Sequence, residues 1–366
     1  MSSNEFHQNV HSLRALAIYS IVAGHVIEIT PWPPGSIWPR LLSSLFEDGS
    51  VVFVFVAGYL FQHLHRRFRY FHYLRRKLSR VIVPYLIVAI PAIVLTLSSG
   101  NVAQHYPQLA GKPLVYQIGW MYLTGGSHVN FALWFIPMIA IFYVAAPLFS
   151  AMVRHPVAYW ILLPLIVVST LLHRVPYPSL AIIHMALYLL PAYIAGMWWS
   201  QFGSALTTRH VLSTTTLLAA TVVVLALPWV ASSHAGNYEE PGYFTFTAGV
   251  IDWLFLARLA TAFLLLLVLA RTPAWLSRRL TPFAATSFGV FFVHCYWLQL
   301  FVQFHNWVAT PGILTWLLTT TTIFAASYWS VIAVDRLFPN AAGYLVGYFR
   351  PARRDDPVKG PVLVAG

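Results

Sequence analysis

Ten long apolar segments run along this chain, each close to the roughly 20 residues that a helix needs to cross a bilayer. Inside a bilayer the backbone must satisfy its own hydrogen bonds, so spans of this kind fold as helices. The sequence therefore predicts an all-α, polytopic integral membrane bundle with about ten transmembrane helices. The predicted spans are Leu13–Thr30, Ser50–Leu64, Val81–Ser99, Phe131–Val153, Ala158–Leu172, Ala181–Ser200, Val211–Val230, Thr247–Ala270, Ala284–Phe304 and Ile313–Val334.

The boundaries of the bundle follow from the same pattern. The second span could begin as early as Leu41, but Glu47-Asp48-Gly49 predicts a break there. The stretch Leu114–Leu123 is too short to cross a bilayer. We expect residues 1–349 to form a single transmembrane domain, and residues 350–366 to form a short, charged, disordered cytoplasmic tail.

Charge is scarce and unevenly placed. Only 9% of the residues are charged and 58% are hydrophobic, whereas soluble domains usually carry about 25% charged residues. The net charge of +12 does not indicate a nucleic-acid partner, because the Lys and Arg residues lie in short stretches between the apolar segments. One set of alternate loops holds seventeen of them and the opposite set holds three. This bias predicts that both termini are cytoplasmic.

Three ionisable residues, Arg14, His25 and Glu28, lie on the first predicted span. A charge at the centre of a bilayer costs about 2.5–3.5 kcal/mol, which makes each a functional candidate. Eleven residues, or almost three turns, separate Arg14 from His25, so both project from one helical face about 16 Å apart. The structural alternative is that Arg14 reaches cytoplasmic phosphates and His25 only bonds a neighbouring helix. Three aligned groups favour function.

Other polar residues in apolar surroundings are weaker candidates. His294 is as consistent with helix packing as with a site. A dyad of His294 with Cys295 is not expected, because adjacent helical residues point about 100° apart. His128 precedes an apolar run and is a candidate for lining an outer cavity. We expect Asp252 and Arg258 to pair structurally within the bundle.

A basic loop, HRRFRYFHYLRRKLSR, carries seven Lys and Arg residues. One interpretation is a topology signal that also contacts anionic lipids. The other is a dock for a phosphorylated cytosolic donor, held by Arg75, Arg76, Lys77 and Arg80. The two interpretations are compatible. No Gly-rich phosphate loop, HEXXH motif or metal-ligand cluster is present in the sequence, so no metal is predicted.

Five ordered motifs between Ser12 and Asp335 resemble those of the family-3 membrane acyltransferases. The first is a basic residue, ten intervening residues and a histidine, here Arg14 to His25. The others are GSVVFVFVAGYLF, FHYLRRKLSRVIVPYL, HVNFALWFIPMIAIFYVAAPL and TSFGVFFVH. The sequence departs from the family at His11, Val51 and Ala57, where many members have Asp, Asp and Ser. In the basic loop, the usual Arg-any-any-Arg is here Lys77 to Arg80.

The resemblance implies transfer of an acyl group, most often acetyl, from acyl-CoA to a hydroxyl of a cell-surface glycan or lipid-linked saccharide. It also implies a multi-pass protein of the bacterial inner (cytoplasmic) membrane. His25 is then the expected general base, with Glu28 as a candidate to fix its tautomer. Arg14 and the loop cations are expected to hold acyl-CoA. The acceptor is expected near Trp134, His128 and His294.

Alternative functions remain open at this point. A glycolipid transporter or flippase would also have many helices and buried charges. The enzyme alternatives are a membrane acyltransferase of the His–Asn type and one that acts on a secondary metabolite. The lack of internal repeats and the spacing of Arg14 and His25 favour the family-3 interpretation. This interpretation predicts a two-sided site, with the donor entering from the cytoplasm and the acceptor from the opposite side.

Overall fold

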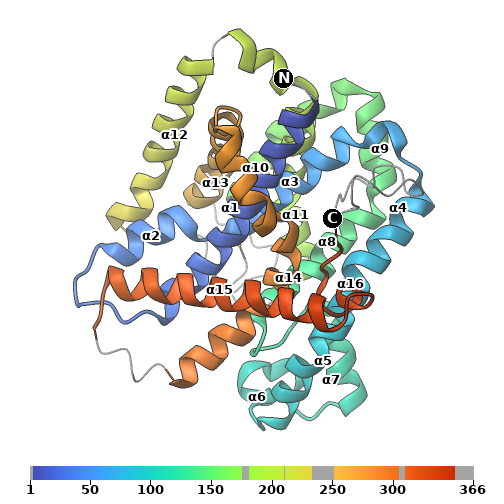
Figure 1. The fold of residues 1–366 in the computed structure, drawn as a ribbon, viewed down its shortest axis with the longest axis vertical. Coiled ribbons are helices and arrows are strands. Elements are labelled where there is room, and N and C mark those ends of the chain that lie inside the picture. Colours follow the sequence, from blue (N-terminus) through green and yellow to red (C-terminus); the bar gives the residue numbers. More distant parts are fainter. Residues whose placement is uncertain (1–2, 175–180, 210, 233–250, 305–309, 351–366) are drawn as a thin grey trace.

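The computed structural model describes residues 3–174, 181–209, 211–232, 251–304 and 310–350. These residues form helices joined by turns and loops, which confirms the all-α fold class (Figure 1). The predicted tail lies outside them apart from Arg350. The α-helices are α1 (Ser3–Ile29), α2 (Trp38–Phe46), α3 (Gly49–His63), α4 (Tyr70–Lys77), α5 (Val83–Ser98), α6 (Val102–His105), α7 (Leu114–Thr124), α8 (Phe135–Val144), α9 (Ala146–Arg154), α10 (Leu162–Leu172), α11 (Ile182–Arg209), α12 (Val211–Ser232), α13 (Trp253–Leu269), α14 (Ala274–Phe304), α15 (Ile313–Leu337) and α16 (Ala342–Val346).

Fewer of the described helices are long and apolar enough to cross a membrane than the ten that the sequence predicts. Among the described residues, six candidate spans are long and apolar enough, and a bent pair of helices adds a seventh. The six are Ser12–Ile29, Trp38–His63, Tyr70–Ser98, Ile182–Gly203, Trp275–Gln303 and Ile313–Leu337. Three further predicted spans coincide with shorter apolar helices: Pro156–Leu172, Ser213–Leu227 and Trp253–Leu269. The ten predicted segments are thus helical, but a count of ten spans is not confirmed, because hydropathy reports apolar character rather than helix length.

Two predicted spans are interrupted. The span at Phe131–Val153 is divided between α8 and α9, which meet at 51°. Pro147 lies at the start of α9, where its missing N–H and its ring prevent α8 from continuing. The break expected at Glu47-Asp48-Gly49 is confirmed, because α2 ends at Phe46 and α3 begins at Gly49. The break between α2 and α3 lies beside the large cavity described below.

Helix α5 shows the kind of surface that lipid requires. Leu86, Ile90 and Val94 are spaced by four residues, so they lie on one helical face. They are 43%, 50% and 56% exposed. An outward stripe of large apolar side chains fits contact with lipid tails, which supports a multi-pass membrane protein.

A close crossing of α3 and α11 stabilises the middle of the bundle. A Cβ added to Gly58 on α3 would collide with the Tyr193 carbonyl of α11, and one added to Gly196 would collide with the Phe55 carbonyl of α3. Each helix therefore presents a glycine at the point where the other backbone approaches it. Small residues at such crossings allow the close packing on which membrane helix pairs depend.

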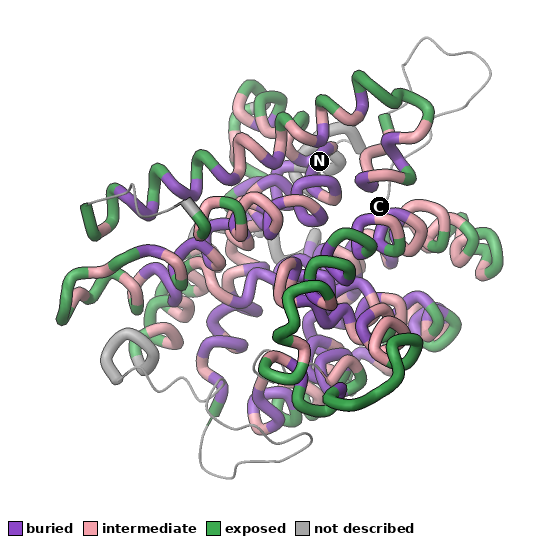
Figure 2. The backbone as a smooth tube through the Cα atoms, turned by 90° about the horizontal axis from the view of Figure 1, so that it is seen from below, coloured by how far each residue is buried: buried purple, intermediate pink, exposed green. Residues whose placement is uncertain are grey.

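Helix α1 lies at the centre of the bundle, where it packs against α14, α3 and α15. Figure 2 shows that buried residues concentrate in the middle of the molecule, whereas exposed residues follow the peripheral helices and turns. Because α1 carries the predicted pair Arg14 and His25, this central position places both residues inside the protein rather than against lipid.

Candidate active site

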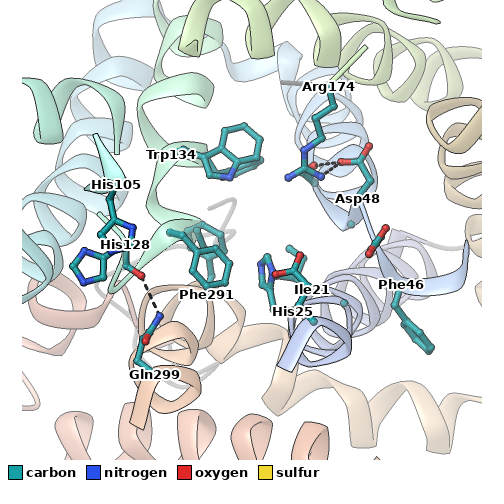
Figure 3. Close-up of a pocket in the computed structure, with 18 residues that line it drawn as sticks. Ile21, His25, Phe46, Asp48, His105, His128, Trp134, Arg174, Phe291 and Gln299 are labelled. Atoms are coloured by element: carbon teal, nitrogen blue, oxygen red, sulfur yellow. Dashed lines mark hydrogen bonds and ion pairs between the residues drawn. The ribbon is translucent and has the colours of Figure 1, made fainter. Parts of the chain in front are cut away.

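A cavity of about 570 Å³ opens beside α1 and contains much of the predicted site. Four of the predicted residues line it, namely His25, Glu28, His128 and Trp134. They come from α1, from the loop after α7 and from the turn that leads into α8. Figure 3 shows His25 on one side of this cavity and His128 on the other, with Trp134 on the wall between them. We refer to this space as the large cavity.

His25 is held in the large cavity by ring contacts. Its imidazole stacks on that of His294 with the ring centroids 5.5 Å apart and the planes 17° from parallel. The edge of the ring meets Phe131 at 4.7 Å. Among the described residues no hydrogen bond joins His25 to Glu28, although both line the same cavity. His294, rather than Glu28, is therefore the neighbour that orients His25.

His294 is fully buried on α14 and does not line the large cavity. Its Nδ1 lies 3.2 Å from the Val290 carbonyl and 2.8 Å from the Phe291 carbonyl. Both acceptors are carbonyl oxygens, so Nδ1 carries the proton and Nε2 is left as an acceptor. His294 thus supports His25 from behind, and its predicted contact with the acceptor has no counterpart in the lining of the cavity.

The expectation that Cys295 and His294 do not meet was wrong as geometry. The Cys295 Sγ lies 3.4 Å from the His294 Nε2, which is within range for a weak S–H hydrogen bond. The long C–S bond of Cys295 and the long side chain of His294 allow the two side chains to meet, although they leave the helix about 100° apart. Cys295 is fully buried and is not part of the cavity lining, so this contact fixes the His294 ring and does not form a nucleophile facing substrate.

Arg14 lies at a second, much smaller cavity of about 30 Å³, which we call the narrow cavity. Its Nη2 donates a hydrogen bond of 3.0 Å to the Ser287 Oγ on α14. Lys77, from the end of α4, lines the same space. The Lys77 ammonium lies 5.5 Å from the ring of Tyr73 and 5.0 Å from that of Tyr143, so two aromatic faces stabilise its charge.

The other predicted loop cations take different positions. Arg75 is exposed and Arg76 is half-buried. The Arg80 guanidinium lies over the Phe349 ring at 5.2 Å. Of the five cations predicted to hold the donor, Arg14 and Lys77 therefore line the narrow cavity. The other three, Arg75, Arg76 and Arg80, do not line it. In the described part of the chain, no three His, Cys, Asp or Glu side chains are grouped so as to hold a metal ion.

An ion pair that sequence reasoning missed forms the wall opposite His128. Arg174 Nη1 donates to Asp48 Oδ1 at 2.6 Å, and the Asp48 side chain is completely buried. The Arg174 guanidinium also lies 5.5 Å from the Trp134 ring (Figure 3). In the sequence, Arg174 counts only as one of the three basic residues of the opposite loops, and Asp48 only as part of the predicted helix break. The two residues are 126 positions apart, so no local sequence pattern predicts their pairing.

The break between α2 and α3 is what delivers Asp48 to the cavity. Asp48 adopts a left-handed conformation with φ of +57°, which Asp tolerates better than most residues. Arg258 then satisfies the end of α2, because its Nε donates to the Glu47 carbonyl at 2.5 Å and its Nη2 to the Ser43 carbonyl at 2.9 Å. Arg258 thus stabilises a helix terminus, whereas the expected pairing of Asp252 with Arg258 is not confirmed.

Asp252 also has a structural role. It caps α13, with its Oδ1 accepting a 2.8 Å hydrogen bond from the Phe255 N–H. The Tyr188 hydroxyl lies 2.9 Å from one oxygen of Asp252 and 2.9 Å from one oxygen of Asp48. A hydroxyl has one proton, so Tyr188 donates to one carboxylate at a time. Through Tyr188 the start of α13 is joined to the cavity wall.

The far wall of the large cavity carries a pair of histidines. The rings of His105 and His128 stack with their centroids 4.4 Å apart and their planes 12° from parallel. Gln299 of α14 donates from Nε2 to the His128 carbonyl at 3.1 Å. Burial, and after it the charge of His105, lower the pKa of His128 below its ordinary value. His128 is therefore neutral near pH 7 and can accept or donate one hydrogen bond.

Comparison with known proteins agrees with this geometry. A family model described as an acyltransferase domain, that of acyltransferase family 3, matches residues 7–334, which is most of the chain. No curated protein and no solved structure matches the chain. The matched region includes both cavities, from Arg14 and His25 on α1 to His294 on α14. The chain therefore belongs to acyltransferase family 3, and it is a membrane acyltransferase rather than a transporter.

Proposed function

We propose that this enzyme moves an acyl group, most often acetyl, from acyl-coenzyme A to a hydroxyl of a cell-surface glycan or a lipid-linked saccharide. One observation carries the proposal. A single helix, α1, places Arg14 at the narrow cavity beside Lys77 and places His25 on the wall of the large cavity. Cations suited to the phosphates of the donor and a base suited to the acceptor hydroxyl thus share one rigid element.

In the proposed reaction His25 is the general base. It takes the proton from the acceptor hydroxyl while that oxygen attacks the thioester carbonyl. The new C–O ester bond forms, the C–S bond breaks, and the proton passes from His25 to the departing coenzyme A sulfur. Because the described contacts of His25 are ring contacts, its nitrogens are available to substrate. The direct attack is proposed here; an acyl-histidine intermediate is the alternative course.

The proposed site is two-sided. The distribution of Lys and Arg favours a cytoplasmic amino terminus, which would put Arg14 near the cytoplasmic surface and His25 about 16 Å deeper. A pantetheine arm is long and thin enough to cover a distance of that order, as a rough estimate from extended-chain dimensions. Only the acyl group then crosses, and the multiply charged coenzyme avoids the cost of entering lipid.

A saccharide is the acceptor class that this proposal names, and the bacterial inner membrane is the location. The large cavity offers three carboxylates, three histidines and an arginine as hydrogen-bonding groups around a space of about 570 Å³. Such a lining suits a ligand with several hydroxyls. A secondary metabolite is the alternative acceptor. Mass spectrometry of surface glycans with and without the gene would separate the two, because only the saccharide acceptor predicts glycan acylation that disappears with the gene.

The catalytic assignment is tested with His25→Ala in purified protein. We expect the rate of acyl transfer from acetyl-coenzyme A to fall by about 10²–10⁴, since a general base contributes that much. His155→Ala is the matched control, because His155 is exposed at the end of α9 and should leave the rate unchanged. Turnover near that of the unmodified protein in folded His25→Ala would show that His25 is not the base.

The two-sided arrangement is tested in sealed vesicles with the protein in known orientation. Acyl-coenzyme A should support transfer only from the face that bears the termini, and an impermeant acceptor only from the opposite face. Reaction with both substrates on the cytoplasmic face alone would contradict the two-sided model, while leaving His25 as the base.

A further inference from the structure

Phe135 occupies a special position between the two cavities. Among the described residues it alone lines both the large cavity and the narrow cavity. Its side chain is 7% exposed. On α1 the narrow cavity ends at Ala17 and the large cavity begins at Ile21, which is about 6 Å further along the helix. The two spaces are therefore separated by about one helical turn, and Phe135 borders the separation from both sides.

Aromatic rings hold Phe135 in place. It meets Phe53 of α3 edge to face with the centroids 6.2 Å apart, and Phe291 of α14 with the centroids 5.6 Å apart. The neighbouring Trp134 ring lies at 6.1 Å. Rings in such arrangements stabilise one another by about 0.5–1.5 kcal/mol per pair beyond the burial of their area. The Phe135 ring thus has a defined resting position, and as a side chain it can still turn about its own bonds.

The two spaces differ greatly in size. The narrow cavity of about 30 Å³ has room for about two water-sized spheres. The large cavity of about 570 Å³ would accept an acyl group much larger than acetyl. A limit on the acyl group is therefore expected at the narrow cavity and at Phe135, which borders it, and not in the large cavity that His25 lines.

We propose that Phe135 is a gate that sets which acyl groups the enzyme transfers. This inference rests on the proposed function, in which the thioester end of the donor comes from the side of Arg14 and Lys77 and must reach His25. Its path runs from the narrow cavity to the large one, and the Phe135 ring must turn aside for the acyl group to pass. Short acyl groups require a small movement, and longer or branched groups require the surrounding rings of Phe53 and Phe291 to move as well.

The test measures thiol release by purified protein in detergent from acetyl-, butyryl- and hexanoyl-coenzyme A. A lipid-linked saccharide extract is added as acceptor, so that the acyl group passes to its hydroxyl or to water as the thiol leaves. Phe135→Ala should raise the ratio of the butyryl rate to the acetyl rate by about tenfold or more, because a few methylenes in a tight passage are worth that much discrimination. Phe135→Trp should lower the same ratio. Phe135→Leu keeps an apolar side chain of intermediate size and provides a reading if the alanine variant does not fold.

Phe142→Ala is the matched control. Phe142 lies on α8 two turns beyond Phe135 and is 3% exposed, so its loss also opens space in the interior. It packs against Phe149 and Tyr193 and lines neither cavity. Its ratio should match that of the unmodified protein.

The outcomes separate the gate from the function beneath it. Absence of thiol release from any donor by the unmodified protein would count against the proposed function itself. Release with a ratio that is the same, within twofold, in the Phe135 variants and in Phe142→Ala would overturn the gate and leave the acyltransferase function standing.

Discussion

The ion pair between Asp48 and Arg174 makes a quantitative prediction about stability. Arg174→Met would leave the fully buried Asp48 carboxylate without its cation. Removing one partner of a buried pair costs about 3–5 kcal/mol. The lower end applies here, because Asp48 keeps the Tyr188 and Ser50 hydroxyls as neighbours at 2.9 Å and 3.0 Å. We therefore expect a loss of about 3 kcal/mol.

Asp48→Asn should cost less. It removes the negative charge but keeps polar atoms for Tyr188 and Ser50, and Arg174 retains both the Trp134 ring and partial exposure of 16%. A hydrogen bond to a charged group contributes about 1.5–3 kcal/mol, which sets the expected loss. The double variant, Asp48→Asn with Arg174→Met, should lose less than the two single losses together, by about 1–3 kcal/mol.

The assay is equilibrium unfolding of the purified protein in one detergent, followed by tryptophan fluorescence, for the four proteins of this cycle. The readout is the coupling free energy, since each single change also alters the cavity wall and would affect activity for that reason alone. Single losses below about 1 kcal/mol that add within about 0.5 kcal/mol would refute the ion pair as a structural element of the cavity.

Three further predictions concern other parts of the molecule. Gly196→Val should greatly reduce the yield of folded protein, because the valine side chain would collide with the α3 backbone. Gly119→Ala should not, because Gly119 lies at an open position; the yield of protein that stays folded in detergent measures both. Ser287→Ala should cost about 1.5–3 kcal/mol and raise the donor KM, because the buried Arg14 guanidinium loses a hydrogen-bond partner; a KM equal to that of the unmodified enzyme would contradict this. The pKa of His128 is lowered on folding, so the unfolded state binds more protons and stability falls as the pH drops below about 6.5; thermal midpoints at pH 5 and pH 8 should show a smaller fall for His128→Gln.

The helical class and the common face of Arg14 and His25 could be predicted from sequence because they depend on local spacing. The eleven residues from Arg14 to His25 set their common face wherever α1 packs. Glu47-Asp48-Gly49 likewise predicted a break from local residue preferences. The count of ten spans is not confirmed, because apolar composition does not show where a proline such as Pro147 bends a helix, or where a helix stops short.

The partners across the site were not accessible, because they depend on which helices meet. Nothing local to His25 indicates that its ring stacks on His294 rather than bonding to Glu28, one turn away. Nothing local to Asp48 indicates Arg174. In the sequence, Phe135 is one of many apolar residues in its predicted span. Only its position between two cavities in the structure distinguishes it.

The hydrogen bond from Arg14 to Ser287 joins residues 273 positions apart, and this distance has a consequence for biosynthesis. At about 5–20 residues per second, Arg14 is added to the chain roughly 14–55 s before Ser287. During that interval the first helix must keep a charged side chain near the membrane surface, where lipid phosphates and water can solvate it. Ser287, the partner of Arg14, and His294, the support behind His25, then arrive together on α14. Under the proposed function, a nascent chain is consequently inert towards acyl donors until its last quarter has entered the membrane.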